Sequence, residues 1–120
     1  MKGILFFALF VLASLGCTKE KFTGNYSFWY NEETSNDLAA FGIATLTMKV
    51  DGMVIGSQDS YKYSAKEPEC GTGNFVYSTQ MFKKENRTHK YEVFSESDSL
   101  IFSGTFLMTQ GKCGSTQLKR

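Results

Sequence analysis

The chain has 120 residues, 13 Lys plus Arg against 12 Asp plus Glu, and 15% aromatic residues, among them 11 Phe and 6 Tyr. This length supports one small domain, and a near-neutral chain without a basic stripe lacks the positive surface that nucleic-acid binding needs. The aromatic content and the single Pro favour a folded, strand-rich domain over disorder.

The first 16 residues have the layout of an export leader. An apolar run from 4 to 15, interrupted at Ser14, is followed by Gly16 and Cys17. The run is shorter than the roughly 20 residues that a transmembrane helix needs, which disfavours a retained span. We expect residues 1–16 to be a lipoprotein signal peptide. The alternative is cleavage by an ordinary signal peptidase, because lipoprotein leaders usually carry Leu where this chain has Ser14.

Under this interpretation Cys17 is the lipidated first residue of the mature chain. Acyl chains hold a small domain on a bilayer without any protein contact, because each buried methylene contributes about 0.8 kcal/mol. We expect a lipidated tether at residues 17–23 and a folded domain at 24–120. The bilayer is therefore the first predicted partner, and the expected location is the cell envelope, at the outer membrane.

The remaining cysteines, Cys70 and Cys113, form the predicted disulfide. An export leader implies an oxidising compartment, in which such a pair is normally bonded. The two residues are 43 positions apart, so their bond restricts the unfolded chain by roughly 3 to 4 kcal/mol. The alternative for Cys70 is a free nucleophile or a metal ligand, but the chain has no Cys-x-x-Cys spacing and one histidine, His89.

The folded part begins with a period-two pattern typical of a half-buried strand. Phe22, Tyr26, Phe28 and Tyr30 share one face, and Trp29 lies on the other. The polar stretch 31–37 predicts a flexible loop, with a short helical turn at 38–40. No segment shows a convincing helical period.

Further short strands follow along the chain. Asp51-Gly52 lies between two apolar runs and predicts a tight hairpin, because both turn positions need positive φ. The other expected strands lie near residues 44–50, 53–55, 61–63, 75–81, 89–93, 100–108 and 118. Seven or eight short strands with frequent turns predict an all-β fold, an antiparallel β-sandwich. The alternative is a small lipocalin-like barrel, which the segment Phe22-Thr23-Gly24-Asn25-Tyr26 favours.

Several motifs together resemble one family. They are Phe28-Trp29-Tyr30-Asn31, Val50-Asp51-Gly52 with Val54 and Gly56, Tyr61, Cys70-Gly71, Ser103-Gly104-Thr105-Phe106, and Cys113 with Leu118. The order of these motifs over residues 24–119 resembles that in small surface lipoproteins of bacteroidete type, whose domain is a PEGA or transthyretin-like β-sandwich. The resemblance implies an architecture and no activity, because such modules usually serve as spacers or as adhesive and accessory domains.

Trp29 and Tyr30 are the predicted partner contacts. Exposed aromatic side chains often anchor a protein or glycan partner, and Trp29 faces away from the apolar side of its strand unless the faces are inverted. His89 as a catalytic base or metal ligand lacks the partners that such sites need.

Two loops contain candidate ligand sites, and each has a simpler interpretation. Glu67, Glu69 and Asp59 form a calcium candidate, but their spacing matches no EF-hand and favours a solvated loop face. Gly71-Thr72-Gly73 resembles part of a phosphate cradle, but no helix is expected after it, so a turn is preferred.

The sequence thus predicts a lipid-anchored envelope protein without enzymatic activity, cofactor or metal, serving in binding or surface structure. The partner is an unidentified protein or glycan, and nucleic acid is excluded. The alternatives are a lipocalin-like carrier of a small apolar ligand, an inhibitor of an enzyme and, third, an enzyme that uses His89.

Overall fold

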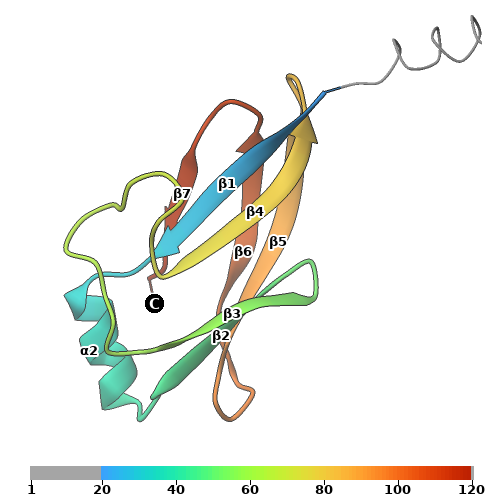
Figure 1. The fold of residues 1–120 in the computed structure, drawn as a ribbon. Coiled ribbons are helices and arrows are strands. Elements are labelled where there is room, and N and C mark those ends of the chain that lie inside the picture. Colours follow the sequence, from blue (N-terminus) through green and yellow to red (C-terminus); the bar gives the residue numbers. More distant parts are fainter. Residues whose placement is uncertain (1–19, 120) are drawn as a thin grey trace, which may run out of the picture.

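A computed structural model of the chain describes residues 20–119, and the expected leader and Cys17 lie outside them. The described part is a two-layer β-sandwich with one helix at its end (Figure 1). Its elements are β1 (Lys21–Trp29), α2 (Glu32–Ala40), β2 (Thr45–Val50), β3 (Met53–Asp59), β4 (Phe75–Phe82), β5 (Asn86–Ser95), β6 (Leu100–Thr109) and β7 (Gly114–Gln117).

The strands form a three-stranded sheet in the order β4-β1-β7 and a four-stranded sheet in the order β3-β2-β5-β6. The predicted sandwich is therefore confirmed, and the alternative of a closed lipocalin-like barrel is wrong, because the two sheets are separate. One pairing departs from the antiparallel expectation, since β7 runs parallel to β1. The chain reaches this position by crossing from β6 in one sheet to β7 in the other.

The core lies between the sheets and is rich in aromatic rings. Tyr26 and Phe28 of β1 face it, as the alternation predicted, and Phe28 is fully buried. The ring centroid of Phe28 lies 5.1 Å from those of Tyr91 and Phe106, and the Phe106 ring meets it edge-on. Burial of one such ring contributes about 1.5 to 3 kcal/mol, so this cluster holds the two layers together.

The hairpin at Asp51-Gly52 is confirmed. Val50 pairs with Met53 across the turn, and φ is 50° at Asp51 and 83° at Gly52. A two-residue loop with both φ values positive matches the right-handed twist of the strands, and glycine adopts this conformation without steric cost.

The prediction of a flexible loop at residues 31–37 was wrong, because α2 begins at Glu32 and Asn31 is its N-cap. The Asn31 side chain caps the helix by accepting the backbone N–H of Thr34 at 3.0 Å, and two acidic residues in the first turn complement the helix dipole. The helix buries Thr34, Ser35 and Leu38. Since only one of these three is apolar, the helix shows no hydrophobic period in the sequence.

Three smaller predictions also need correction. No strand forms at residues 61–63, because 60–74 is an irregular connection between the sheets. The last strand is Gly114–Gln117 and ends before Leu118. β1 begins at Lys21, so the end of the tether expected at 17–23 belongs to the sandwich. Within residues 20–119, no helix has the length and apolar character needed to cross a bilayer.

Candidate binding surface

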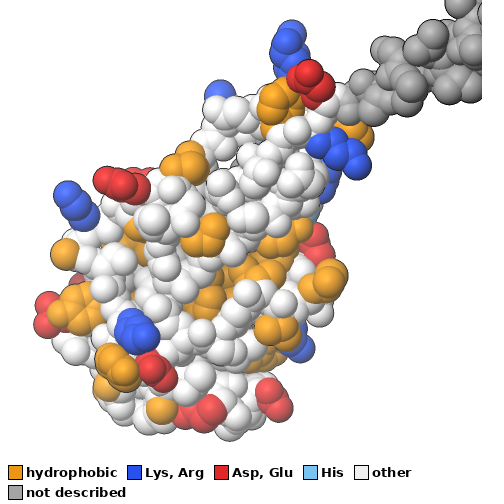
Figure 2. Space-filling view, viewed as in Figure 1, with side chains coloured by type: hydrophobic (Ala, Val, Ile, Leu, Met, Phe, Trp, Pro, Cys, Tyr) orange, Lys and Arg blue, Asp and Glu red, His pale blue; other side chains and the backbone are white. Residues whose placement is uncertain are grey.

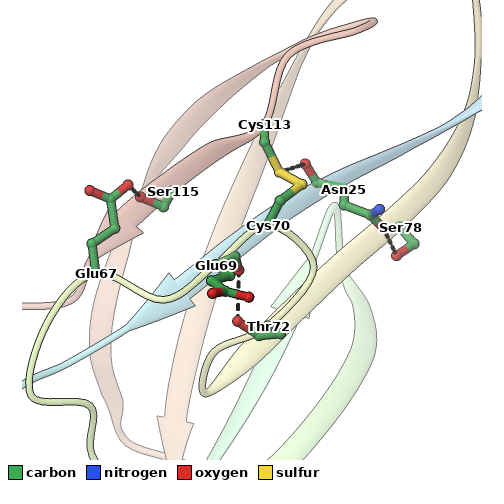
Figure 3. The surroundings of a disulfide bond; sticks show 8 residues. All are labelled: Asn25, Glu67, Glu69, Cys70, Thr72, Ser78, Cys113 and Ser115. Carbon is green, nitrogen blue, oxygen red and sulfur yellow. Dashed lines mark hydrogen bonds between the residues drawn. A yellow bond between two sulfur atoms is a disulfide. The ribbon is translucent and has the colours of Figure 1, made fainter.

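The predicted disulfide is present and fixes the long connection between the sheets. Cys70 in that connection is bonded to Cys113 in the turn between β6 and β7, with the Cα atoms 5.7 Å apart. Figure 3 shows the bond lying against β1, where the Cys113 sulfur is 4.0 Å from the carbonyl oxygen of Asn25. The free-thiol and metal-ligand interpretations of Cys70 are therefore wrong.

Hydrogen bonds hold the same connection on both sides of the disulfide. Ser115 of β7 donates its hydroxyl proton to the Glu67 carboxylate at 2.6 Å (Figure 3). Asn74 accepts the backbone N–H of Tyr30 at 3.1 Å and donates to the carbonyl oxygen of Lys62 at 2.8 Å. Residues 60–74 are thus tied to β7 and to Tyr30, which directly follows β1, although they form no strand.

The two predicted partner contacts are not exposed in the way expected. Trp29 is half-buried on the outer side of β1, and its carbonyl oxygen accepts the N–H of Leu118 at 2.7 Å. Tyr30 is fully buried, which excludes it as a direct contact. Burial raises the pKa of the Tyr30 phenol to about 12, and the nearby Asp59 charge adds to the shift.

Tyr30 instead supports a surface from the inside. Its hydroxyl lies 3.2 Å from the carbonyl oxygens of both Asp59 and Ser60, where β3 ends. The Ser35 hydroxyl of α2 donates to the same Ser60 carbonyl at 2.8 Å. The Ser60 hydroxyl donates to the carbonyl oxygen of Ile43 at 2.6 Å, so β3, α2 and the segment before β2 meet at this point.

A groove lies on the outer side of this junction. It has a volume of about 450 Å³ and is lined by Ala39, Gly42, Ile43, Ala44, Thr45, Asp59, Ser60 and Tyr61. One lining side chain is an exposed aromatic, because Tyr61 is 69% exposed. Its lining combines an apolar floor with hydroxyl and carboxylate groups.

A second, polar hollow adjoins this groove. It has a volume of about 290 Å³ and is lined by Thr45, Ser57, Gln58, Asp59, Lys62 and Asn74. Thr45 and Asp59 line both spaces. The Tyr61 hydroxyl is hydrogen-bonded to Asp59, and this bond raises the pKa of the phenol above its usual value. We refer to the two adjoining spaces as the distal groove.

Glu96 fixes one wall of the distal groove. Its carboxylate accepts the backbone N–H groups of Ala44, at 3.0 Å, and of Thr45, at 3.1 Å. These hydrogen bonds hold the pKa of the Glu96 carboxyl below its usual range, and the bond from Ala44 has the largest effect. The anionic form is therefore favoured, and it holds the start of β2 in place beside the groove.

His89 is buried within β5 and does not form part of an open site. Its Nδ1 lies 2.6 Å from Oδ2 of Asp51, and its ring packs between those of Tyr77 and Phe106, at centroid distances of 5.0 and 5.3 Å. Its Nε2 is buried and, within the described residues, has no hydrogen-bond partner. This environment matches a structural histidine, with Asp51 orienting the ring.

Both loop candidates lie within the described part of the chain. Among residues 20–119, no group of three or more His, Cys, Asp or Glu side chains is arranged to hold a metal ion. The segment Gly71-Thr72-Gly73 leads into β4, and Thr72 donates its N–H and its hydroxyl proton to the carbonyl oxygen of Glu69. The preferred turn is therefore observed.

Sequence reasoning missed the distal groove. One available signal was the sequence of Asn31 followed by two acidic residues, which is typical of a helix start. A helix there would have placed Phe41 at its end, beside the start of β2. The contact between α2 and residue 60 has no local sequence signal.

Comparisons with known proteins identify no family for the chain. No family model matches the chain, and neither does any curated protein. Among solved structures, the chain is similar to a protein titled "Structures of Clostridium thermocellum CbhA fibronectin(III)-like modules", with 16% identity and a TM-score of 0.29. That match covers 64% of this chain and 69% of the other.

Proposed function

We propose that this chain is a lipid-anchored protein of the cell envelope, held at the outer membrane through Cys17, and that its sandwich is a non-catalytic binding module for an oligosaccharide. The leader layout and the bonded Cys70–Cys113 pair support the anchor, because they leave Cys17 as the unpaired cysteine. The resemblance to bacteroidete-type surface lipoproteins agrees with this proposal.

The distal groove is the observation that carries the binding role. A sugar ring has an apolar face and a rim of hydroxyl groups. The groove offers both kinds of partner, since its lining includes Tyr61 and the aliphatic Ile43 together with the polar side chains of Asp59, Lys62 and Asn74. A space of several hundred Å³ with a few placed polar groups is typical of small-molecule sites.

The position of the groove also fits a lipid-anchored protein. β1 leads away from residue 20 over nine residues, which is about 30 Å of strand, and α2 follows at its far end. Figure 1 shows the start of β1 and α2 at opposite ends of the domain. A groove beside α2 therefore faces away from a membrane that holds the N-terminus.

The test is a titration of the mature chain with soluble fragments of cell-envelope polysaccharide and peptidoglycan. We expect the Tyr61→Ala variant to bind at least about tenfold more weakly, because truncation of an exposed aromatic anchor commonly costs more than about 1.4 kcal/mol. Tyr63→Ala is the matched control, since Tyr63 is 46% exposed and lines neither space of the groove.

Two outcomes would contradict the binding role. One is equal affinity of the wild type and Tyr61→Ala for every fragment that binds. The other is absence of glycan binding together with a stoichiometric protein complex, which would identify an inhibitor or adaptor instead.

A further inference from the structure

The end of the domain where β1 begins differs in charge from the end that carries the groove. This N-terminal end consists of residues 20–22, the β4–β5 turn at 82–87 and the adjoining β6–β7 turn at 110–112. Lys21 pairs with Phe82 across the sheet. The N–H of Lys84 donates to the Gln110 side chain at 3.2 Å, so the three segments form one surface.

Positive charge dominates this end. Its acid Glu85 is compensated, since its carboxylate accepts hydrogen bonds from the Arg87 guanidinium at 2.8 and 3.1 Å. The remaining charged residues of the three segments are Lys21, Lys83, Lys84 and Lys112 against Glu20. Figure 2 shows blue side chains gathered at this end, next to the grey trace.

The opposite end is acidic. α2 carries Glu32, Glu33 and Asp37, and the β5–β6 turn carries Glu96 and Asp98, with Lys62 and Lys119 as nearby cations. The domain is therefore polarised along its length, although the whole chain is nearly neutral. A surface of anionic phosphates attracts one end of such a molecule and repels the other.

Apolar groups accompany the lysines. Phe82 is 40% exposed, and Nζ of Lys21 lies 5.9 Å from the centroid of its ring. A hollow of about 380 Å³ is lined by Glu20, Phe22, Phe82 and Lys83. Aromatic rings beside lysine side chains match the boundary between headgroups and acyl chains, where each part finds its preferred surroundings.

The distance from the anchor links this surface to a bilayer. Cys17 precedes Lys21 by four residues, which span at most about 14 Å when fully extended. That reach is close to the screening length of about 8 to 10 Å at physiological salt. Lys21 therefore lies within or near the range of the membrane's surface potential.

We propose that the N-terminal end of the domain docks onto the anionic phospholipid headgroups of the membrane that holds it, with Lys21, Lys83 and Lys84 on phosphates and Phe82 at the acyl boundary. The proposal rests on the lipid anchor proposed above. Docking orients the sandwich upright, so that the distal groove points away from the bilayer. The acidic end is held off the same surface by repulsion.

The test uses the mature chain with a single fourteen-carbon alkyl chain coupled chemically to the Cys17 thiol. One such chain gives only marginal binding, with a partition constant near 10⁴ M⁻¹, so an electrostatic contribution is measurable. We expect markedly stronger partition onto vesicles with 30% phosphatidylglycerol than onto pure phosphatidylcholine, and a loss of this preference in high salt. Lys83→Gln/Lys84→Gln should weaken binding to the anionic vesicles about 30-fold.

Lys66→Gln/Lys90→Gln is the matched control, because both lysines are exposed and lie outside the N-terminal end and the distal groove, Lys66 in the 60–74 connection and Lys90 in β5. It should bind as the wild type does. Equal weakening by both double variants, or no preference for anionic vesicles, would overturn the proposal. Because the alkyl chain is attached chemically, the vesicle result does not depend on whether the cell acylates Cys17. Palmitate labelling of the wild type and of Cys17→Ala tests that acylation separately.

Discussion

Nδ1 of His89 and Oδ2 of Asp51 lie 2.6 Å apart, and this contact joins the β2–β3 turn to β5. The other Asp51 oxygen accepts the N–H of Lys90 at 3.0 Å. The hydrogen bond from His89, followed by that from Lys90, lowers the pKa of Asp51 below its ordinary 3.8. The turn of the hairpin is thus held by an ionised carboxylate.

Asp51→Asn should therefore lower stability in a pH-dependent way. A carboxyl whose pKa is lowered by folding contributes stability above its ordinary pKa and loses it as pH falls through the lowered value. We expect a loss of roughly 1 kcal/mol at pH 7, since Asp51 is half exposed, and a shrinking difference below about pH 4. Urea unfolding of both proteins from pH 7 to 2.5 measures this. A constant difference throughout would be inconsistent with the hydrogen bonds described.

Tyr30→Phe should loosen the junction behind the distal groove. The change removes one hydroxyl, which bridges the carbonyl oxygens of Asp59 and Ser60, and leaves the ring in place. We expect a loss of about 1 kcal/mol in the free energy of unfolding, as for one buried hydrogen bond. Faster amide exchange in residues 59–61 should accompany it. Unchanged stability and exchange would show that the hydroxyl does not position this surface.

Replacing both Cys70 and Cys113 with Ser should lower the melting temperature by well over 10 °C. The bond spans 43 positions, for which the loop-entropy relation gives about 4 kcal/mol, and 1 kcal/mol corresponds to roughly 4 to 8 °C in a domain of this size. The double variant avoids a new bond between Cys17 and a single remaining partner. Calorimetry of the oxidised wild type and the variant gives the comparison, and coincident transitions would refute the stabilising role.

Gly114→Ala should destabilise the sandwich, whereas Gly56→Ala should be tolerated. A Cβ at Gly114 would lie 2.8 Å from Cδ2 of Tyr26, and that ring is held by a 2.8 Å hydrogen bond between its hydroxyl and the Thr116 hydroxyl. A Cβ at Gly56 would meet Phe75 at an ordinary 3.8 Å. We expect a loss of about 1 to 3 kcal/mol for the first change only. Equal unfolding midpoints in urea would contradict this packing.

Strand positions and the disulfide were accessible from the sequence because they follow from local patterns. Alternation of apolar and polar residues placed Tyr26 and Phe28 in the core, and the Asp51-Gly52 pair defined a hairpin. The pairing of Cys70 with Cys113 followed from the assignment of Cys17 to the anchor. Each of these inferences needed only the pattern of neighbouring residues or the number of cysteines in the chain.

The distal groove was not accessible in this way. The face that α2 buries is formed by Thr34, Ser35 and Leu38, and its polar members become buried because they find carbonyl partners far along the chain. Tyr30 continues the apolar pattern of β1 and is buried with it, so its prediction as a partner contact was wrong. The Tyr30 hydroxyl bonds to the carbonyl oxygens of Asp59 and Ser60 at the end of β3. The sequence around Tyr30 does not specify where β3 ends.

Mass spectrometry of the protein purified from membranes tests the central claim, a lipid-held sandwich, most directly. The account predicts an N-terminal peptide that begins at Cys17 and carries a diacylglycerol group, together with a linked pair of peptides containing Cys70 and Cys113. An unmodified N-terminus, or a Cys17 joined to another cysteine, would contradict it.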